Sequence, residues 1–187
     1  MEIVKKWASC FISFVAGVLA LALSACSGMI KLITIAGQTE SETTKAFKVL
    51  TDGDLLKQAE AMDLGGKFTT MKVFSIVLMV VAVLLLAYSI VMLLKNFNVI
   101  KLDSKVFAIV GLSLAVLFLI STIGVFVSSL TYANAATEFI SDALKAYELM
   151  NIKVSGVVKL GVYQPIMLAT GIISTAVVTA FEIRNVK

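Results

Sequence analysis

The chain has 187 residues, of which 59% are hydrophobic and only 15% are charged, with a mean hydropathy of +1.00. A soluble domain of this size must cover its surface with polar groups, so this composition argues against a water-soluble globular protein. The net charge is +4, but the sequence has no basic stripe with interleaved aromatic residues, which argues against nucleic acid as a partner.

Four apolar blocks each reach the roughly 20 residues that are needed to cross a ~30 Å hydrocarbon core. They cover residues 7–27, 73–94, 106–130 and 160–181, and none carries Asp, Glu, Lys or Arg in its body. Because backbone polar groups in lipid must bond within their own segment, these blocks are predicted to be helices. The predicted fold is an all-α membrane protein, a single four-transmembrane-helix bundle over residues 1–187 that is surrounded by the lipid bilayer.

The orientation is predicted from the distribution of the charged residues. The short polar segments 1–6, 95–105 and 182–187 together carry the whole net charge of +4, whereas the long segments 31–72 and 131–159 are each neutral. Short loops rich in Lys and Arg stay in the cytoplasm. Both termini and the 95–105 loop are therefore predicted to be cytoplasmic, with both long loops on the other side of the cell membrane.

Amphipathic helices are predicted in both outer loops. In the first, a run at residues 46–50 precedes a break and N-cap within Thr51-Asp52-Gly53-Asp54, and a second short helix is predicted to end at Gly65-Gly66. In the second, apolar residues recur at three-to-four spacing between 132 and 150, so the third span is predicted to continue outward. Seven apolar loop residues either pack together or form a partner surface: Phe47, Leu50, Leu55, Leu56, Phe139, Ile140 and Tyr147.

Small residues recur at every fourth position in the first and fourth spans, a pattern that lets helices approach closely in lipid. The favoured interpretation is that these two spans pack on each other within one chain. The alternative is contact between subunits of an oligomer. The residues concerned are Ala16, Gly17, Ala20, Ser24 and Gly28, and then Gly161, Pro165 and Gly171.

The segment Leu23-Ser24-Ala25-Cys26 follows an apolar run that Lys5 and Lys6 precede. These first residues resemble the signal peptide of bacterial lipoproteins, including its lipobox. In that family the peptide is cut before the cysteine, which is then lipidated, so the resemblance implies Cys26 as the modified residue. A bacterial source also fits the excess of lysine over arginine. The alternative is that the segment is the outer end of an uncut first span.

Catalytic chemistry has few candidates in this sequence. It has no histidine, the commonest general base and a frequent metal ligand. It has no glycine-rich phosphate loop or nucleophile elbow, and no ionisable residue in mid-membrane. The acidic pair in Asp52-Gly53-Asp54 is interpreted as a turn with a cap rather than a calcium site. We therefore expect no enzyme activity, no cofactor and no metal site.

Two functional hypotheses remain. The first is a non-enzymatic membrane scaffold or accessory subunit whose extracytoplasmic loops contact another protein or a like subunit. The second is a homo-oligomeric pore, because four spans with two structured outer loops is also the plan of several junctional and large-pore channel proteins. That likeness is one of topology alone.

Overall fold

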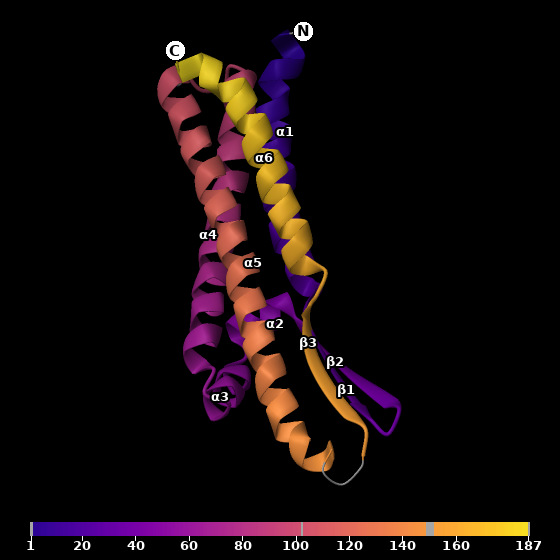
Figure 1. The fold of residues 1–187 in the computed structure, drawn as a ribbon. Helices are drawn as coiled ribbons and strands as arrows, with labels where there is room; N and C mark the ends of the chain where they lie inside the picture. The colour runs from indigo at the N-terminus through magenta and orange to yellow at the C-terminus, as the bar shows by residue number, and fades with distance from the viewer. Residues whose placement is uncertain (1, 102, 149–151, 187) are drawn as a thin grey trace. The chain divides into compact units, whose positions relative to one another are not determined.

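The computed structural model describes residues 2–101, 103–148 and 152–186, and it is mostly helical with one small sheet (Figure 1). The chain divides into two compact units. The helix unit comprises Met1–Ala22, Ile76–Ile123 and Ile166–Lys187, and the sheet unit comprises Leu23–Ser75 and Gly124–Pro165. The single domain over residues 1–187 stays a prediction.

The described residues include four helices that are long and apolar enough to cross a membrane, so the protein is a multi-pass membrane protein and the four predicted spans are confirmed. The predicted spans 73–94 and 106–130 lie inside α4 and α5. Helix α5 continues well beyond residue 130, as its periodicity predicted. The fourth span starts a little later than predicted, because residues up to 160 form a strand. The helices are α1 (Glu2–Ala22), α4 (Gly65–Asn96), α5 (Ser104–Glu148) and α6 (Tyr163–Val186).

The first span is shorter than predicted, because α1 ends at Ala22 instead of continuing to residue 27. A short 3-10 helix, η1 (Leu23–Ala25), follows, and the Cys26 N–H donates to the Leu23 carbonyl oxygen at 2.8 Å. The Cys26 carbonyl oxygen then accepts from the Ala46 N–H at 3.0 Å, a partner outside the helix. The residues that follow, of which those from 31 onward were predicted to belong to the first outer loop, form a strand.

Glycines bring the spans of the helix unit together in pairs. A Cβ atom at Gly17 of α1 would lie 2.9 Å from the Ala82 carbonyl oxygen of α4, so the two helices touch there. A Cβ at Gly171 of α6 would collide with the Thr122 side chain of α5. These close contacts join the first span to the second and the fourth to the third. Packing of the first span on the fourth stays a prediction.

A three-stranded antiparallel sheet lies in the sheet unit, and it corrects the predicted all-α fold class. Its strands are β1 (Ser27–Ile35), β2 (Gln38–Lys45) and β3 (Val154–Leu160), in the order β2-β1-β3. The central strand β1 pairs Ile35 with Gln38 of β2 and with Val154 of β3. The sheet therefore joins the two outer loops, for which helices but no strands were predicted.

A tight two-residue turn connects β1 to β2. Ala36 and Gly37 both have positive φ, at 49° and 86°. This is the pattern of a type I′ hairpin turn, whose twist matches that of the flanking strands. Glycine adopts such φ values without steric cost, whereas alanine does so at a cost of about 1–2 kcal/mol. The hairpin therefore forms despite a strained residue at its first turn position.

Substitutions in this turn are expected to shift the stability of the hairpin in opposite directions. No atom lies within 4 Å of a Cβ placed at Gly37, so Gly37→Ala tests backbone strain alone and should destabilise the hairpin by about 1–2 kcal/mol. Ala36→Gly should stabilise it by about 0.5 kcal/mol, because relief of strain exceeds the added chain entropy. Amide hydrogen exchange of β1 and β2 measures both effects. Gly53→Ala, at an open position without positive φ, is the control, and an equal effect there would contradict the explanation.

Two short helices, α2 (Ala46–Thr51) and α3 (Gly53–Ala61), follow the hairpin. The Asp52 carboxylate accepts from the Asp54 N–H at 3.0 Å, which confirms the predicted break and N-cap. Lys57 forms a 3.1 Å ion pair with Asp54. The two acidic residues therefore cap and pair with groups in the first turn of α3. The amphipathic character of the loop helices stays a prediction.

Helix α3 ends at a Schellman motif, whereas the sequence predicted a stop at Gly65-Gly66. Asp63 has a φ of 56°, the Leu64 N–H donates to the Ala59 carbonyl oxygen at 2.7 Å, and the Asp63 N–H donates to Glu60 at 3.0 Å. This is the double hydrogen bond of the motif, with its apolar contact between Leu64 and Ala59. Gly65 and Gly66 are instead the first residues of α4.

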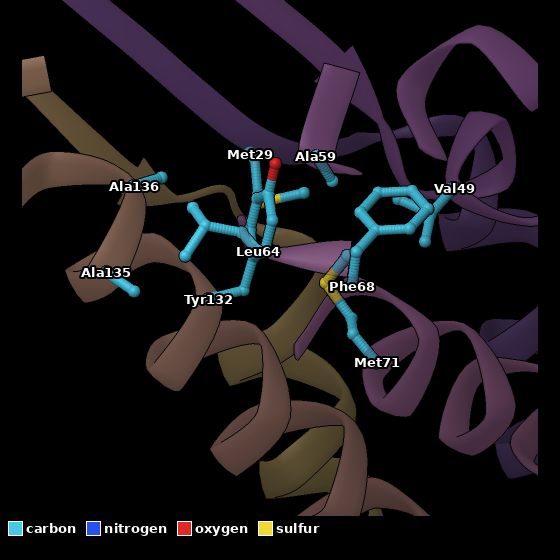
Figure 2. Close-up of a cluster of buried hydrophobic side chains, with 9 residues drawn as sticks. All are labelled: Met29, Val49, Ala59, Leu64, Phe68, Met71, Tyr132, Ala135 and Ala136. Carbon is cyan, nitrogen blue, oxygen red and sulfur yellow. The ribbon is translucent and has the colours of Figure 1, made fainter. Parts of the chain in front are cut away.

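The core of the sheet unit draws on both loops and on the ends of two spans. Figure 2 shows its buried side chains gathering between β1, the short helices, α4 and α5. Phe68 of α4 packs edge-on against Tyr132 of α5, with ring centroids 5.6 Å apart. The buried members are Met29, Val49, Ala59, Leu64, Phe68, Met71, Tyr132, Ala135 and Ala136.

Candidate interaction surface

The two edges of the sheet differ in how they are covered. The Val158 N–H of β3 donates to the Thr137 hydroxyl of α5 at 2.9 Å, and this hydroxyl also donates to the Ala133 carbonyl oxygen at 2.8 Å. Gly156 of β3 leaves room for the Ile140 side chain of the same helix. Helix α5 therefore covers the β3 edge and satisfies part of its backbone.

Strand β2 forms the other edge, and all of its residues except Thr44 are exposed. Among the described strands, none pairs with the outer side of β2. Glu40 and Glu42 lie on one face of the strand, since side chains alternate along it. An exposed edge offers free backbone donors and acceptors, and charged residues limit indiscriminate pairing. The open edge of this sheet is therefore polar and acidic.

The seven apolar loop residues of the predicted partner surface fall into two groups. Phe47, Phe139 and Tyr147 are 52%, 43% and 50% exposed. The other four are half-buried, and of these Leu55 and Leu56 pack against the buried core and Ile140 approaches Gly156. The three exposed aromatic side chains and the β2 edge are the two exposed features of the sheet unit that are considered below.

Two of the glycines predicted to pack membrane helices lie at the sheet instead. The Gly161 N–H donates to the Gly28 carbonyl oxygen at 2.8 Å. A Cβ at Gly28 would come within 2.9 Å of the Ala46 backbone. These glycines let the start of β1 approach its neighbours closely. Ser24, four residues before Gly28 in the chain, is buried. Pro165, in the first turn of α6, is exposed.

The remaining predicted packing residues lie in the helix unit. Ala16 and Ala20 are buried on the same face of α1, and Gly17 contacts α4. Gly171 is the position where α6 meets α5. These four positions are consistent with close helix approach within one chain.

The candidate lipidation site, Cys26, is a free thiol that is half-buried. It lies directly between η1 and β1. Its N–H and carbonyl oxygen both take part in backbone hydrogen bonds within the sheet unit. Cleavage before Cys26 would cut the chain at this junction, and lipidation stays a prediction.

Several structural residues were not identified from the sequence. The role of Thr137 as acceptor for β3 depends on a partner 21 positions away, and no local pattern indicates it. Gly156 was not singled out either, although an isolated glycine inside an apolar run is a known sign of close approach. No group of three potential metal ligands gathers in the part of the chain that the structure describes.

A comparison with protein-family models finds no match, and comparisons with curated proteins and with solved structures find none either.

Proposed function

We propose that the protein is a non-enzymatic membrane scaffold or accessory subunit, and that its sheet unit docks another protein or a like subunit outside the cytoplasm. The observation that carries the proposal is the asymmetry of the sheet. Helix α5 covers the β3 edge, whereas β2 is exposed along almost its whole length. A strand edge of this kind can be extended by a partner strand, with backbone hydrogen bonds supplying affinity.

The exposed aromatic residues support the same proposal. Phe47, Phe139 and Tyr147 present large apolar area without serving the core of the sheet unit. Aromatic residues are enriched among those that dominate protein interfaces. The proposed placement outside the cytoplasm rests on the charge distribution, because the two loops that build the sheet unit are neutral and the short segments are basic.

A cysteine on the exposed strand tests docking and orientation together. Ser41→Cys is treated in intact cells with a membrane-impermeant thiol-to-amine crosslinker. The proposal predicts a discrete product of higher mass, whose composition shows a like subunit or another protein. Asn98→Cys, at an exposed position in the 95–105 loop, is the matched control and should not react. The unmodified chain, which contains Cys10 and Cys26, is the control for reaction at the native cysteines.

Two results would contradict the proposal. Reaction of Asn98→Cys without reaction of Ser41→Cys would reverse the orientation. The docking role would be ruled out if Ser41→Cys reacted but gave only the singly modified chain, and if cysteines introduced in place of Phe139 and Tyr147 also gave no crosslinked product.

A further inference from the structure

The outer edge of β2 presents a definite set of backbone groups. Strands β1 and β2 pair antiparallel, with Ile35 opposite Gln38 across the two-residue turn. In such a hairpin the residues that flank the turn form a hydrogen-bonded pair, and these pairs then alternate along the strands. The backbone groups of Thr39, Ser41 and Thr43 therefore point away from β1. Among the described residues, none forms a hydrogen bond with these outward groups.

The covered edge of the sheet supports this alternation. Strand β1 pairs Leu32 with Val157 of β3. Because Leu32 turns its backbone groups away from β2, it bonds to Val157, and the N–H of the next residue, Val158, points away from β1. That N–H donates to the Thr137 hydroxyl of α5 at 2.9 Å. The same geometry thus holds on both sides of β1, but a helix meets the outward groups of β3 only.

The two glutamates of β2 lie between its outward groups. Glu40 and Glu42 are exposed, and neither takes part in an ion pair with another described residue. An added antiparallel strand would place its own residues opposite them in non-hydrogen-bonded pairs, where Cα atoms are about 4.5 Å apart and side chains are closest. Opposite charges across such a pair stabilise it, and like charges destabilise it. The edge therefore favours a strand with Lys or Arg at alternate positions.

The neighbouring strand compensates the two glutamates unequally. Glu42 lies opposite Lys31 of β1, whereas Glu40 lies opposite the apolar Ile33. Glu40 therefore has no cation directly across from it on the existing sheet. A cationic side chain on an added strand would gain most at Glu40.

A second copy of β2 does not suit this edge. A symmetric antiparallel pair of β2 strands keeps the same face of both strands on the same side of the extended sheet. Glu40 and Glu42 share a face, so the registers that pair most of the strand set Glu40 opposite Glu42 of the other copy, or Glu42 opposite its counterpart. Both arrangements oppose like charges. The glutamates thus act against self-pairing while they admit a basic strand.

We propose that the β2 edge binds an extended, basic segment of another protein as an additional antiparallel strand of the sheet. The backbone groups of Thr39, Ser41 and Thr43 supply the hydrogen bonds, and Glu40 and Glu42 select Lys or Arg at alternate positions of the segment. This inference rests on the proposed docking function and adds the chemistry of the partner.

The test measures the binding of three short synthetic peptides to the purified full chain in neutral detergent. Lysine alternates with valine in the first peptide, and glutamate replaces lysine in the second. The third is the lysine peptide with N-methylated backbone amides, which cannot complete a strand ladder. The lysine peptide should bind about tenfold more tightly than the glutamate peptide, and N-methylation should abolish its binding. Equal affinities for any two of these peptides would overturn the proposal.

Charge substitutions on β2 test the selection. Glu40→Lys with Glu42→Lys should exchange the affinities of the lysine and glutamate peptides. Because Glu42→Lys lies opposite Lys31 and can weaken the hairpin, Glu40→Gln with Glu42→Gln is a second variant, which should bind both peptides about equally. Glu60→Lys with Glu138→Lys, at exposed positions of α3 and α5, is the matched control and should keep the preference. A lysine preference that survives in the Gln variant would contradict the proposal.

Amide hydrogen exchange identifies the mode of binding. The lysine peptide should slow the exchange of the outward N–H groups of Thr39, Ser41 and Thr43. It should change Glu40 and Glu42 less, because their N–H groups already point toward β1. Protection without this alternation would show that the peptide does not add to the sheet as a strand.

The inference can fail while the docking function holds. If the Ser41→Cys crosslink captures a partner but the unmodified chain binds the lysine and glutamate peptides equally, docking stands and the basic segment is ruled out. A crosslinked pair of like subunits would have the same meaning. If the lysine peptide binds with alternating protection but no crosslinked product forms in cells, the docking function fails and the inferred chemistry of the edge stands.

Discussion

Phe68→Ala is expected to destabilise the sheet unit by about 3–5 kcal/mol, the usual cost of deleting a fully buried aromatic ring. Phe68 is only 1% exposed and packs edge-on against Tyr132, so its ring joins α4 to α5 within the core. Removing the ring leaves a cavity within this cluster of buried side chains, which its neighbours can fill only in part. Figure 2 shows the Phe68 ring beside Val49 within this cluster.

Hydrogen exchange of the slowest amides in β1 and β3 measures this loss, because these strands lie against the cluster through Met29 and Val158. Phe47→Ala is the matched control, since it removes the same ring from the same unit at a position that is 52% exposed. That variant should change stability by no more than about 0.5 kcal/mol. Equal effects of the two substitutions would show that the buried cluster does not stabilise the sheet.

Gly156→Val is expected to separate β3 from α5. A Cβ atom at Gly156 would collide with the Cγ2 of Ile140 and would lie 3.2 Å from Leu144. The Ile140 side chain is branched at Cβ and has little freedom to move aside. Overpacking of this kind costs about 1–3 kcal/mol, and loss of the Val158–Thr137 hydrogen bond adds to it.

A double-mutant cycle isolates this contact. Ile140→Ala should restore much of the stability lost in Gly156→Val, because it removes the colliding methyl group, although it is destabilising on its own. Stability is followed by thermal unfolding in detergent and by hydrogen exchange of β3. Gly66→Ala, at an open helical position of the same unit, is the control and should be neutral or slightly stabilising. Strict additivity of the two substitutions would contradict a direct collision.

The membrane spans could be predicted from the sequence because lipid allows few alternatives. A run of some 20 apolar residues in a bilayer must satisfy its own backbone, which makes it a helix whatever its neighbours are. The same logic misled the prediction at the end of α1. Residues 29–35 continue the apolar run, and their strand character depends on pairing with β2 and with β3. The turn between β1 and β2 is Ala36-Gly37, not one of the more typical Asn-Gly or Asp-Gly pairs.

The candidate site was only partly predictable for a related reason. The sequence identified apolar loop residues but could not separate those that pack inward from those that face outward. Leu55 and Phe47 look alike in sequence, yet the first packs on the core and the second is exposed. Gly28 and Gly161 were predicted to pack membrane helices for the same reason. A small residue indicates that another element approaches closely, but it does not indicate which element that is.

The central position of β1 has a consequence for the synthesis of the protein. One neighbour of β1 follows it directly, but the other, β3, is made only after α2, α3, α4 and α5. At ribosomal speed this interval is on the order of ten seconds. During that time the backbone edge of β1 that later pairs with β3, including Ile33 and Ile35, has no partner strand. The nascent chain can then pair incorrectly with other chains. During every round of translation, the unpaired edge of β1 must therefore be kept from other chains until β3 has been made.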